Sequence, residues 1–492
     1  MNERLQQFAA SFVASTREYI FIRPEDHLLI LRPNKVHHLN AMATEMLRAL
    51  YTSEQVDVDA LVREIAARYQ TPPEQIENDL DKLLDSLRWM LQNKPGMGAA
   101  VKRTPFGTHE IKFPVLSEIA LTYRCNNKCT FCYASAPERG PIVGEMTTDE
   151  VKRIIDKIVD QAKVPTISFT GGEPTLRRDL PDLIEYARSR QMRANLITNG
   201  IRSADAEFVA RLKDAGLNSA QVSLEAADAD VHNQIVGNPR AFEKTVQAVK
   251  NLKAAGIHTH TNTTINRYNR NHLIALIDFL ADLGQEYLSM NMVIRTGDAV
   301  TSQKLKVKSV KSEIENSKSQ KSNPKIQSEN IEIGYGDIGE LVLGLKKHAE
   351  ARGMRFVWYS PVPYCLFNPA QHGLGSQSCA AADGLLSVNP SGDVLPCSSF
   401  EQGIGNLLRQ DFDTIWNTRT AKYWRKKEFL PPDCRGCELA NLCCGACPLY
   451  WDEVGSFGEI EKVTPHRASA LEKTIWDAKR RWIGQAKGVG VG

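Results

Sequence analysis

Three closely spaced cysteines have the pattern of a metal–sulfur site. Cys125, Cys129 and Cys132 lie in CNNKCTFC, a Cys-x₃-Cys-x₂-Cys triplet with Phe131 just before the last cysteine. Three thiolates on one tight loop can hold three irons of a 4Fe–4S cube and leave the fourth iron open. A zinc site or buried free thiols are the alternatives, but zinc prefers four ligands and Cys-x₂-Cys pairs. The triplet therefore favours a catalytic iron–sulfur cluster.

The elements that must position this triplet follow a strand–helix rhythm that begins near residue 115. The expected strands are 117–123, 165–170, 194–198, 220–226, 258–265 and 287–294. Amphipathic segments between them predict helices at 149–162, 179–190, 206–216, 241–256 and 271–284. Such alternation predicts an α/β fold with a parallel sheet and helices outside it. Chemistry in these sheets lies at the carboxyl ends of the strands, and the triplet directly follows the first one.

A second motif follows the second expected strand. In SFTGGEPTL, Gly171 and Gly172 allow the backbone to approach a ligand closely, and Glu173 could receive an ammonium group. A glycine-rich turn with Pro174 starting a helix is the alternative. The motif is informative because the cysteine triplet stands one strand earlier.

Together these motifs resemble the radical S-adenosylmethionine (SAM) superfamily over roughly residues 115–300. The resemblance implies a partial (βα)₆ TIM-like barrel whose cluster is held by Cys125, Cys129 and Cys132. It implies that the methionyl amine of SAM is held by Gly171, Gly172, Glu173 and Pro174. The family's ribose motif is similar to QVSLEA, with Ser223 and Glu225 as contacts, and Asn199 also fits. Many relatives have Asp where Glu225 stands, and Asn199 with the following glycine equally suits a simple turn.

The chemistry implied by this resemblance is reductive cleavage of SAM. One electron from the cluster would give methionine and a 5′-deoxyadenosyl radical, which removes a hydrogen atom from a positioned substrate. The protein contributes orientation and exclusion of water.

The chain contains eleven cysteines, and eight of them lie between Cys365 and Cys447. Clustering of this kind fits metal sites better than dispersed disulfides. The region 365–466 resembles the SPASM extension of radical SAM proteins, with a zinc ribbon as the alternative. The resemblance implies one auxiliary cluster on Cys379, Cys397 and Cys447, with Cys365 as a possible fourth ligand. A second cluster would use Cys434, Cys437 and Cys443, and its missing ligand could be Cys444, Asp452, His466 or no protein group.

Residues 1–95 form a separate unit in this interpretation. Two β-rich runs, 19–23 and 27–32, precede three helices at 39–51, 58–69 and 76–91, which suggests a winged-helix-like α+β domain. The unit resembles the PqqD-like domain, a peptide-recognition element, and an exposed edge strand beside a helix can accept an extended peptide. A DNA-binding winged helix is disfavoured because no basic stripe is present. A purely structural or dimerising role is the remaining alternative.

The other boundaries follow from composition. Residues 96–114 are expected to be a linker, 301–332 a disordered Ser/Lys-rich insertion or a lysine-rich binding arm, and 333–362 a connecting helix and strand. A cysteine-rich cluster-binding domain spans 363–466, and 467–492 is a final helix and tail. A net charge of +3 gives no reason to expect nucleic-acid binding. Neither an export signal nor a membrane-spanning stretch is evident, so we expect a cytoplasmic protein.

The leading hypothesis is a peptide-modifying radical SAM/SPASM enzyme. It would bind the leader of a ribosomally made precursor peptide on residues 1–95 and oxidise a core residue, for example by forming a thioether or carbon–carbon cross-link. Its cofactors would be SAM, the SAM-binding 4Fe–4S cluster and one or two auxiliary iron–sulfur clusters, with flavodoxin or ferredoxin as electron donor. The alternatives are a tetrapyrrole (haem-pathway) side-chain-modifying radical SAM enzyme and a non-catalytic metal-bound peptide-recognition protein.

Overall fold

The chain forms two compact units, each with its own hydrophobic core. The computed structural model describes residues 3–32, 35–91, 101–103, 111–136, 144–299, 331, 333–464 and 467–485. The first unit comprises Met1–Leu116 with Lys163–Thr166, and the second comprises Ser117–Ala162 with Ile167–Gly492. Apart from Ile331, the predicted insertion 301–332 lies outside the described residues. Of the predicted linker, only 101–103 and 111–114 are described, and the end of the tail is not.

The first unit is a four-stranded antiparallel sheet with four helices. Its strands pair in chain order and are β1 (Ile20–Arg23), β2 (Leu28–Leu31), β3 (Lys35–Leu39) and β4 (Val101–Arg103). Its helices are α1 (Glu3–Thr16), α2 (Ala41–Thr52), α3 (Val58–Tyr69) and α4 (Pro73–Leu91). Asn40 and Asp57 cap α2 and α3 by accepting a backbone N–H through their side chains. A single core includes Leu5, Leu29 and Leu47, which come from α1, β2 and α2.

The prediction of two strands and three helices for this unit was incomplete. It missed α1, whose apolar residues alternate with many polar ones, and it missed β3, whose two histidines obscure the strand pattern. It also placed β4 in a linker. A three-residue strand has almost no pattern of its own, and this one is defined by its pairing with His37, His38 and Leu39 of β3.

The second unit is built on a ten-stranded sheet. Its order is β11-β10-β9-β8-β7-β6-β5-β12-β13-β14. The parallel part consists of β5 (Leu116–Thr122), β6 (Thr166–Gly171), β7 (Arg193–Thr198), β8 (Ser219–Ser223), β9 (His258–Ile265), β10 (Tyr287–Met292) and β11 (Arg355–Trp358). The six predicted strands lie within this set, and β11 adds a seventh. The fifth predicted strand, 258–265, has the bounds that the structure gives to β9.

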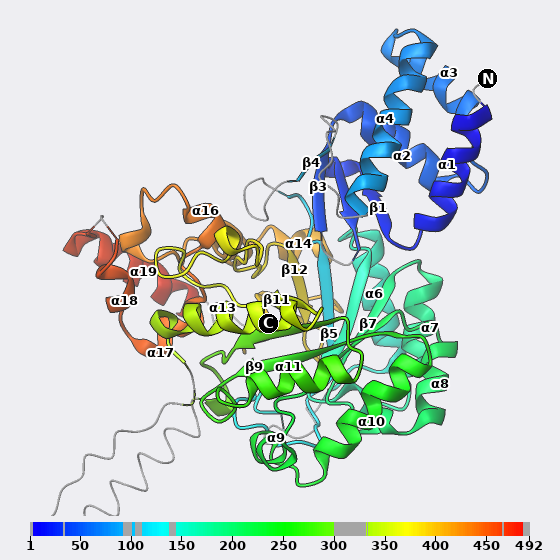
Figure 1. Ribbon diagram of the computed structural model, residues 1–492. Coiled ribbons are helices and arrows are strands. Elements are labelled where there is room, and N and C mark those ends of the chain that lie inside the picture. Colours follow the sequence, from blue (N-terminus) through cyan, green and yellow to red (C-terminus); the bar gives the residue numbers. More distant parts are fainter. Residues whose placement is uncertain are drawn as a thin grey trace, which may run out of the picture. The chain divides into compact units, whose positions relative to one another are not determined.

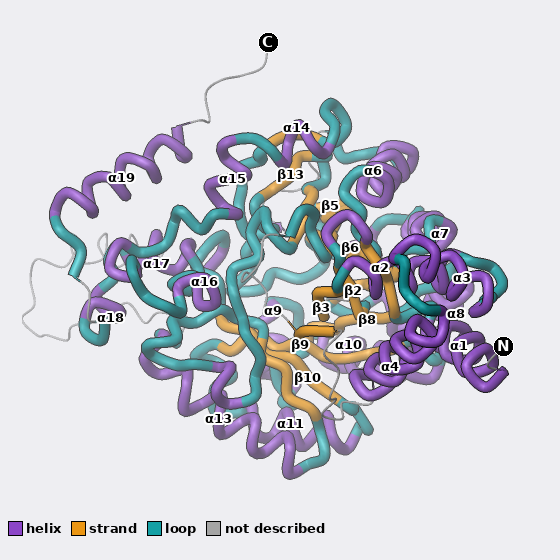
Figure 2. Tube along the Cα trace, turned by 90° about the horizontal axis from the view of Figure 1, so that it is seen from above, coloured by secondary structure: helices purple, strands orange, loops and turns teal. Residues whose placement is uncertain are grey.

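Helices flank the parallel strands, as predicted (Figures 1 and 2). They are α6 (Thr148–Asp160), α7 (Leu180–Ser189), α8 (Ala206–Asp214), α10 (Ala241–Ala254), α11 (Leu273–Asp282) and α13 (Tyr335–Ala351). Helix α6 begins with a capping box between Thr147 and Glu150 and buries its isoleucine face. The short helix α9 (Ala229–Val236) was not predicted. No described helix has both the length and the apolar character that crossing a membrane would require.

The cysteine-rich region continues the sheet of the second unit. Strand β12 (Leu385–Val388) neighbours β5, and β13 (Asp393–Leu395) and β14 (Gly405–Asn406) follow in an antiparallel meander. Ser387 of β12 donates a hydrogen bond to Glu118 of β5 at 2.7 Å. Short helices complete this part, namely α14 (Phe412–Trp416), α15 (Arg419–Arg425), α16 (Ala440–Cys443), α17 (Pro448–Val454), α18 (Gly458–Glu461) and α19 (Ala470–Gln485). The cysteine-rich region is therefore joined directly to the parallel sheet.

Candidate functional site

The cysteine loop follows β5 and is fixed by the turn that follows β6. The Gly172 N–H donates to the Thr122 carbonyl at 2.8 Å, and the Glu173 N–H donates to the Arg124 carbonyl at 2.9 Å. A Cβ atom on Gly172 would lie 2.4 Å from the Arg124 carbonyl oxygen, so only glycine fits there. Gly171 has a φ of 134° and its Cβ would lie 2.2 Å from the Thr122 carbonyl oxygen. The two glycines thus press the GGEP turn against the start of the cysteine loop.

Two further glycines fix the other side of the same loop. The Lys128 and Thr130 N–H groups donate to carbonyls of Val236 and Ile235 at the end of α9. A Cβ on Gly237 would lie 2.5 Å from the Lys128 carbonyl oxygen, and one on Gly297 would lie 2.3 Å from that of Cys132. The sequence analysis missed both glycines, since only their positive φ and their positions against a distant loop reveal them.

The three thiols lie near one another on this loop. Cys125 and Cys132 each accept a backbone N–H, from Asn127 at 3.4 Å and from Ala136 at 3.5 Å. Burial raises the pKa of Cys125 to about 11, and it also raises the pKa of Cys132. Burial raises the pKa of Cys129 most, and the charges of Cys132 and Cys125 raise it further. Such raised values mean that burial favours the neutral thiols over three free thiolates, so binding of a cluster would release their protons.

The donor set fits an iron–sulfur cluster. Its soft sulfur atoms are half-buried, and backbone N–H groups point at two of them. Among the residues that the structure describes, no group of three or more His, Cys, Asp or Glu side chains has the arrangement needed around one metal ion. A 4Fe–4S cube offers a separate iron to each thiolate, so its ligands need not converge on a single point.

Glu173 connects the GGEP turn to the neighbouring strand end. Its side chain is fully buried. One carboxylate oxygen accepts hydrogen bonds from the Thr175 N–H, the Thr175 hydroxyl and the Thr198 hydroxyl at 3.1, 2.6 and 2.8 Å. The other accepts the Asn199 N–H at 2.8 Å. Burial raises the pKa of Glu173, while these hydrogen bonds act in the opposite direction. Four donors therefore already use this carboxylate.

The other predicted SAM contacts also lie at the carboxyl ends of strands. Pro174 opens a short 3₁₀ helix, and Asn199 follows β7 and donates from its side chain to Asn126 in the cysteine loop at 2.6 Å. Ser223 is the last residue of β8. Glu225 is buried and accepts the Thr264 N–H at 2.9 Å, and burial raises its pKa to about 8. The predicted strand 220–226 was too long, because the chain leaves β8 after Ser223. All of these residues share one edge of the sheet with the triplet.

Cys397 lies within electrostatic range of two other later cysteines and of strand β5. Burial raises the pKa of Cys397 well above its usual range, with further contributions from Cys379, Cys447 and Glu118 of β5. Burial also raises the pKa of Tyr133, and Glu118 and Cys132 raise it further. Glu118 is thus within electrostatic range of both Tyr133 and Cys397, and Tyr133 is within range of Cys132; sequence reasoning missed Tyr133 and Glu118.

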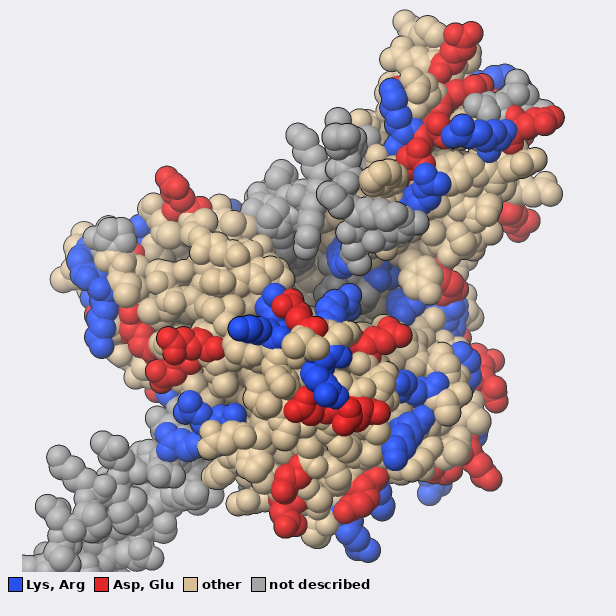
Figure 3. Space-filling view, viewed as in Figure 1, with Lys and Arg blue, Asp and Glu red and all other residues tan. Residues whose placement is uncertain are grey.

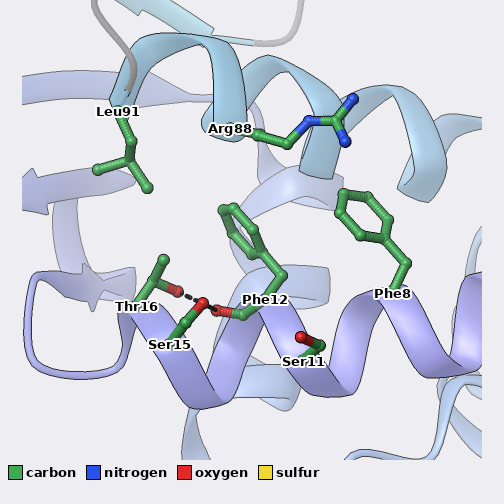
Figure 4. A pocket seen from close by; sticks show the side chains of 7 residues that line it. All are labelled: Phe8, Ser11, Phe12, Ser15, Thr16, Arg88 and Leu91. Atoms are coloured by element: carbon green, nitrogen blue, oxygen red, sulfur yellow. Dashed lines mark hydrogen bonds between the residues drawn. The ribbon is translucent and has the colours of Figure 1, made fainter.

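A small pocket in the first unit is lined by none of the residues predicted to bind the cluster or SAM. Phe8 and Phe12 of α1 face α4, and the Arg88 guanidinium lies 5.3 Å from the Phe8 ring centroid (Figure 4). The lining residues are Phe8, Ser11, Phe12, Ser15, Thr16, Arg88 and Leu91.

On the face that Figure 3 shows, basic and acidic side chains are intermingled.

Comparisons with known proteins match three parts of the chain. Residues 27–88 match coenzyme PQQ synthesis protein D (PqqD), residues 119–280 match the radical SAM superfamily, and residues 379–438 match an iron–sulfur cluster-binding domain (SPASM). These domains imply a 4Fe–4S cluster and auxiliary clusters, with SAM as cofactor. The three matches confirm the resemblances on which the sequence analysis relied.

Relatives with two different named activities have similar sequence identity to this chain. An AdoMet-dependent heme synthase of Methanosarcina barkeri is 26% identical over 72% of this chain and 97% of its own length. A PqqA peptide cyclase of Granulibacter bethesdensis is 27% identical over 66% of this chain and 80% of its own length. The crystal structure of Streptococcus suis SuiB bound to its precursor peptide SuiA shares the fold, with a TM-score of 0.61, 16% identity and coverage of 89% of this chain and 96% of SuiB. The chain is a radical SAM enzyme that carries a PqqD domain before its radical SAM domain and a SPASM domain after it.

Proposed function

We propose that the protein oxidatively modifies a ribosomally made peptide, for example by thioether or carbon–carbon cross-linking. The observation that carries this proposal is the presence of a PqqD domain in the same chain as the radical SAM and SPASM domains. The relative named PqqA peptide cyclase and the fold shared with SuiB, which was solved with a precursor peptide, support a peptide substrate. The proposed domains span 1–95, 115–300 and 363–466, in a (βα)₆-like barrel flanked by a winged-helix-like and a cluster-binding domain.

In this proposal the thiolates of Cys125, Cys129 and Cys132 hold the catalytic cluster. When bound, that cluster supplies the electron that cleaves SAM to methionine and a 5′-deoxyadenosyl radical. The GGEP turn of residues 171–174 would hold the methionyl amine, and Asn199, Ser223 and Glu225 would contact the rest of the cofactor. Glu173 holds this turn in place through Thr198 and Asn199, and Asn199 also donates to Asn126 of the cysteine loop.

The remaining partners are an electron donor and the peptide. Auxiliary clusters on the later cysteines would accept the electron released when the substrate radical is oxidised. An external flavodoxin or ferredoxin would reduce the catalytic cluster. The peptide leader would bind the sheet of the first unit, since backbone pairing at a sheet edge accepts many sequences.

The register of the first sheet identifies edge positions at which such binding can be tested. The Arg32 N–H donates to the Tyr19 carbonyl, and residues alternate between inward and outward amides in an antiparallel ladder. The Ile22 amide of β1 therefore points away from β2. By the same reasoning, the Leu39 N–H donates to the His27 carbonyl, so the Val36 amide of β3 points away from β2, and Val36 lies beyond the three residues that pair with β4.

Proline substitutions at these two positions test the leader-binding proposal. Ile22→Pro or Val36→Pro removes an outward donor and leaves the pairing with β2 in place. We expect one of them to weaken binding of the precursor peptide by at least tenfold in fluorescence anisotropy, whereas Phe8→Ala in the pocket between α1 and α4 should not. Removal of residues 1–95 should abolish binding. Unchanged affinity after that removal would contradict the proposal.

A tetrapyrrole substrate is the second candidate, because relatives named AdoMet-dependent heme synthase match as well as the peptide cyclases do. The two candidates differ in how they depend on the first unit. A tetrapyrrole would change its visible absorbance on binding, and that change would persist without residues 1–95. Mass spectrometry of a co-expressed precursor peptide would identify a peptide product directly.

A further inference from the structure

The eight later cysteines fall into two sets that differ from the sets expected from sequence. The segment before Cys365 is hydrogen bonded to Cys443, 79 residues further along the chain. The Tyr364 N–H donates to the Cys443 sulfur at 3.2 Å, and the Cys443 thiol donates to the Val362 carbonyl at 3.8 Å. Cys365 is therefore held beside Cys443 by its own neighbours in the chain.

Cys434, Cys437 and Cys443 come from one compact stretch of backbone. The Cys437 N–H donates to the Cys434 carbonyl at 3.2 Å, and the Cys443 N–H donates to the Leu439 carbonyl at 2.9 Å. Cys434 also shares a hydrophobic core with Val362 and Phe367, which flank Cys365 on either side. The hydrogen bonds of Val362 and Tyr364 with Cys443 thus bring the segment just before Cys365 to this stretch.

Electrostatic effects among the thiols agree with this arrangement. Burial raises the pKa of Cys365, and the Cys437 thiol raises it further. Burial raises the pKa of Cys434 to about 12, with further contributions from Cys443, Cys365 and Cys437. For Cys443, burial is again the main cause, and Cys444 and Cys365 add to it. Charges influence one another in this way only at short range.

Of the other candidates for the missing ligand, Cys444 and Asp452 lie within electrostatic range of members of the set of Cys379, Cys397 and Cys447. Cys444 is fully buried, and its sulfur lies 2.8 Å from the Ser378 hydroxyl, next to Cys379. Asp452 raises the pKa of Cys447, for which burial and Cys379 are the larger causes, so it belongs to the neighbourhood of Cys379, Cys397 and Cys447. His466 lies outside the described residues.

We propose that Cys365 is the fourth ligand of the auxiliary cluster held by Cys434, Cys437 and Cys443. This inference rests on the proposed function, in which the later cysteines hold auxiliary clusters. A 4Fe–4S cluster with four thiolates has no open iron, so this one transfers electrons and does not bind substrate. Cys365 and Cys437 are exposed, so the cluster faces solvent and can exchange electrons with an external partner. Any open auxiliary iron then belongs to the set of Cys379, Cys397 and Cys447 beside β5.

The test compares single and double variants of the full chain after anaerobic reconstitution with iron and sulfide. Iron, acid-labile sulfide and EPR spectra are measured for Cys365→Ala, Cys437→Ala and Cys397→Ala. With three clusters in the wild type, Cys365→Ala should lose about a third of the iron, or convert one cluster to a 3Fe–4S form with its own EPR signal. Tyr364→Phe, which keeps the thiol, is the matched control and should retain all the iron.

Additivity decides which set contains Cys365. The double variant Cys365→Ala/Cys437→Ala should lose no more than one cluster, whereas Cys365→Ala/Cys397→Ala should lose two. The inference is overturned if Cys365→Ala leaves the iron content and the EPR spectra unchanged. It is also overturned if Cys365→Ala/Cys397→Ala loses only one cluster while Cys365→Ala/Cys437→Ala loses two. A wild-type chain that binds zinc and no iron would overturn the proposed function instead, so the two failures are distinguishable.

Discussion

Replacement of Glu173 by glutamine tests whether this carboxylate organises the GGEP turn. The substitution keeps the shape of the side chain but turns one acceptor oxygen into an NH₂ donor. Three donors face one carboxylate oxygen and only the Asn199 N–H faces the other, so the glutamine oxygen is expected to occupy the first position. Its NH₂ group then faces the Asn199 N–H, donor against donor, in a fully buried position.

The magnitude follows from the hydrogen bonds that are lost. One charge-assisted bond is replaced by an unsatisfied buried donor, which costs about 2–4 kcal/mol of the free energy of unfolding. For a unit of this size, that loss lowers the thermal transition by about 3–5 °C. Because Asn199 also donates to Asn126, we expect the cysteine loop to lose iron more readily as well.

The assay is differential scanning calorimetry of the iron-loaded chain at pH 8. Glu185→Gln, on the exposed face of α7, is the matched control and should change the free energy of unfolding by less than about 0.5 kcal/mol. If Glu173→Gln melts like this control but binds SAM more weakly, the carboxylate contacts the cofactor and the reasoning is refuted.

Other predictions concern the clamp on the cysteine loop and the response to pH. Gly297→Ala should destabilise the second unit by about 1–3 kcal/mol and reduce iron loading, because its Cβ would lie 2.3 Å from the Cys132 carbonyl oxygen at a positive φ. Urea titration measures the free energy of unfolding of both variants. Gly344→Ala in α13, where a Cβ meets nothing within 4 Å, should stabilise the second unit slightly. Burial lowers the pKa of His260, which stacks on Tyr287, to about 3. The unfolded chain therefore binds the extra proton first, and stability should fall as the pH drops from about 6.5 towards 3. His260→Gln should reduce that slope by up to about 1.4 kcal/mol per pH unit, and an unchanged slope would contradict the assignment.

The parallel sheet and its active edge could be predicted from sequence because local pattern determines them. Buried β-branched runs separated by amphipathic helices indicate the strands of a parallel sheet, and the triplet and GGEP each stand at the end of a strand. Helix α9 could not be predicted in this way, since its eight residues carry mixed polarity and its role depends on the contact of its end with Lys128 and Thr130.

Contacts between distant segments account for the rest of what was missed. Gly237 and Gly297 look ordinary in the sequence, and only the structure places them against the cysteine loop. The partner of Cys365 is equally hidden, because the hydrogen bond from Tyr364 to Cys443 spans 79 residues. Cysteine spacing indicates that clusters are present, but it does not assign each cysteine to a cluster.

The most direct test of the central claim is SAM cleavage by the anaerobically reconstituted chain. With dithionite and SAM, the wild type should release 5′-deoxyadenosine, measured by liquid chromatography. Cys129→Ala should release none, although it retains the iron of its auxiliary clusters. Cys437→Ala should still cleave SAM and fail only in complete turnover of the peptide. Absence of 5′-deoxyadenosine from the iron-loaded wild type, or its formation by Cys129→Ala, would contradict the account.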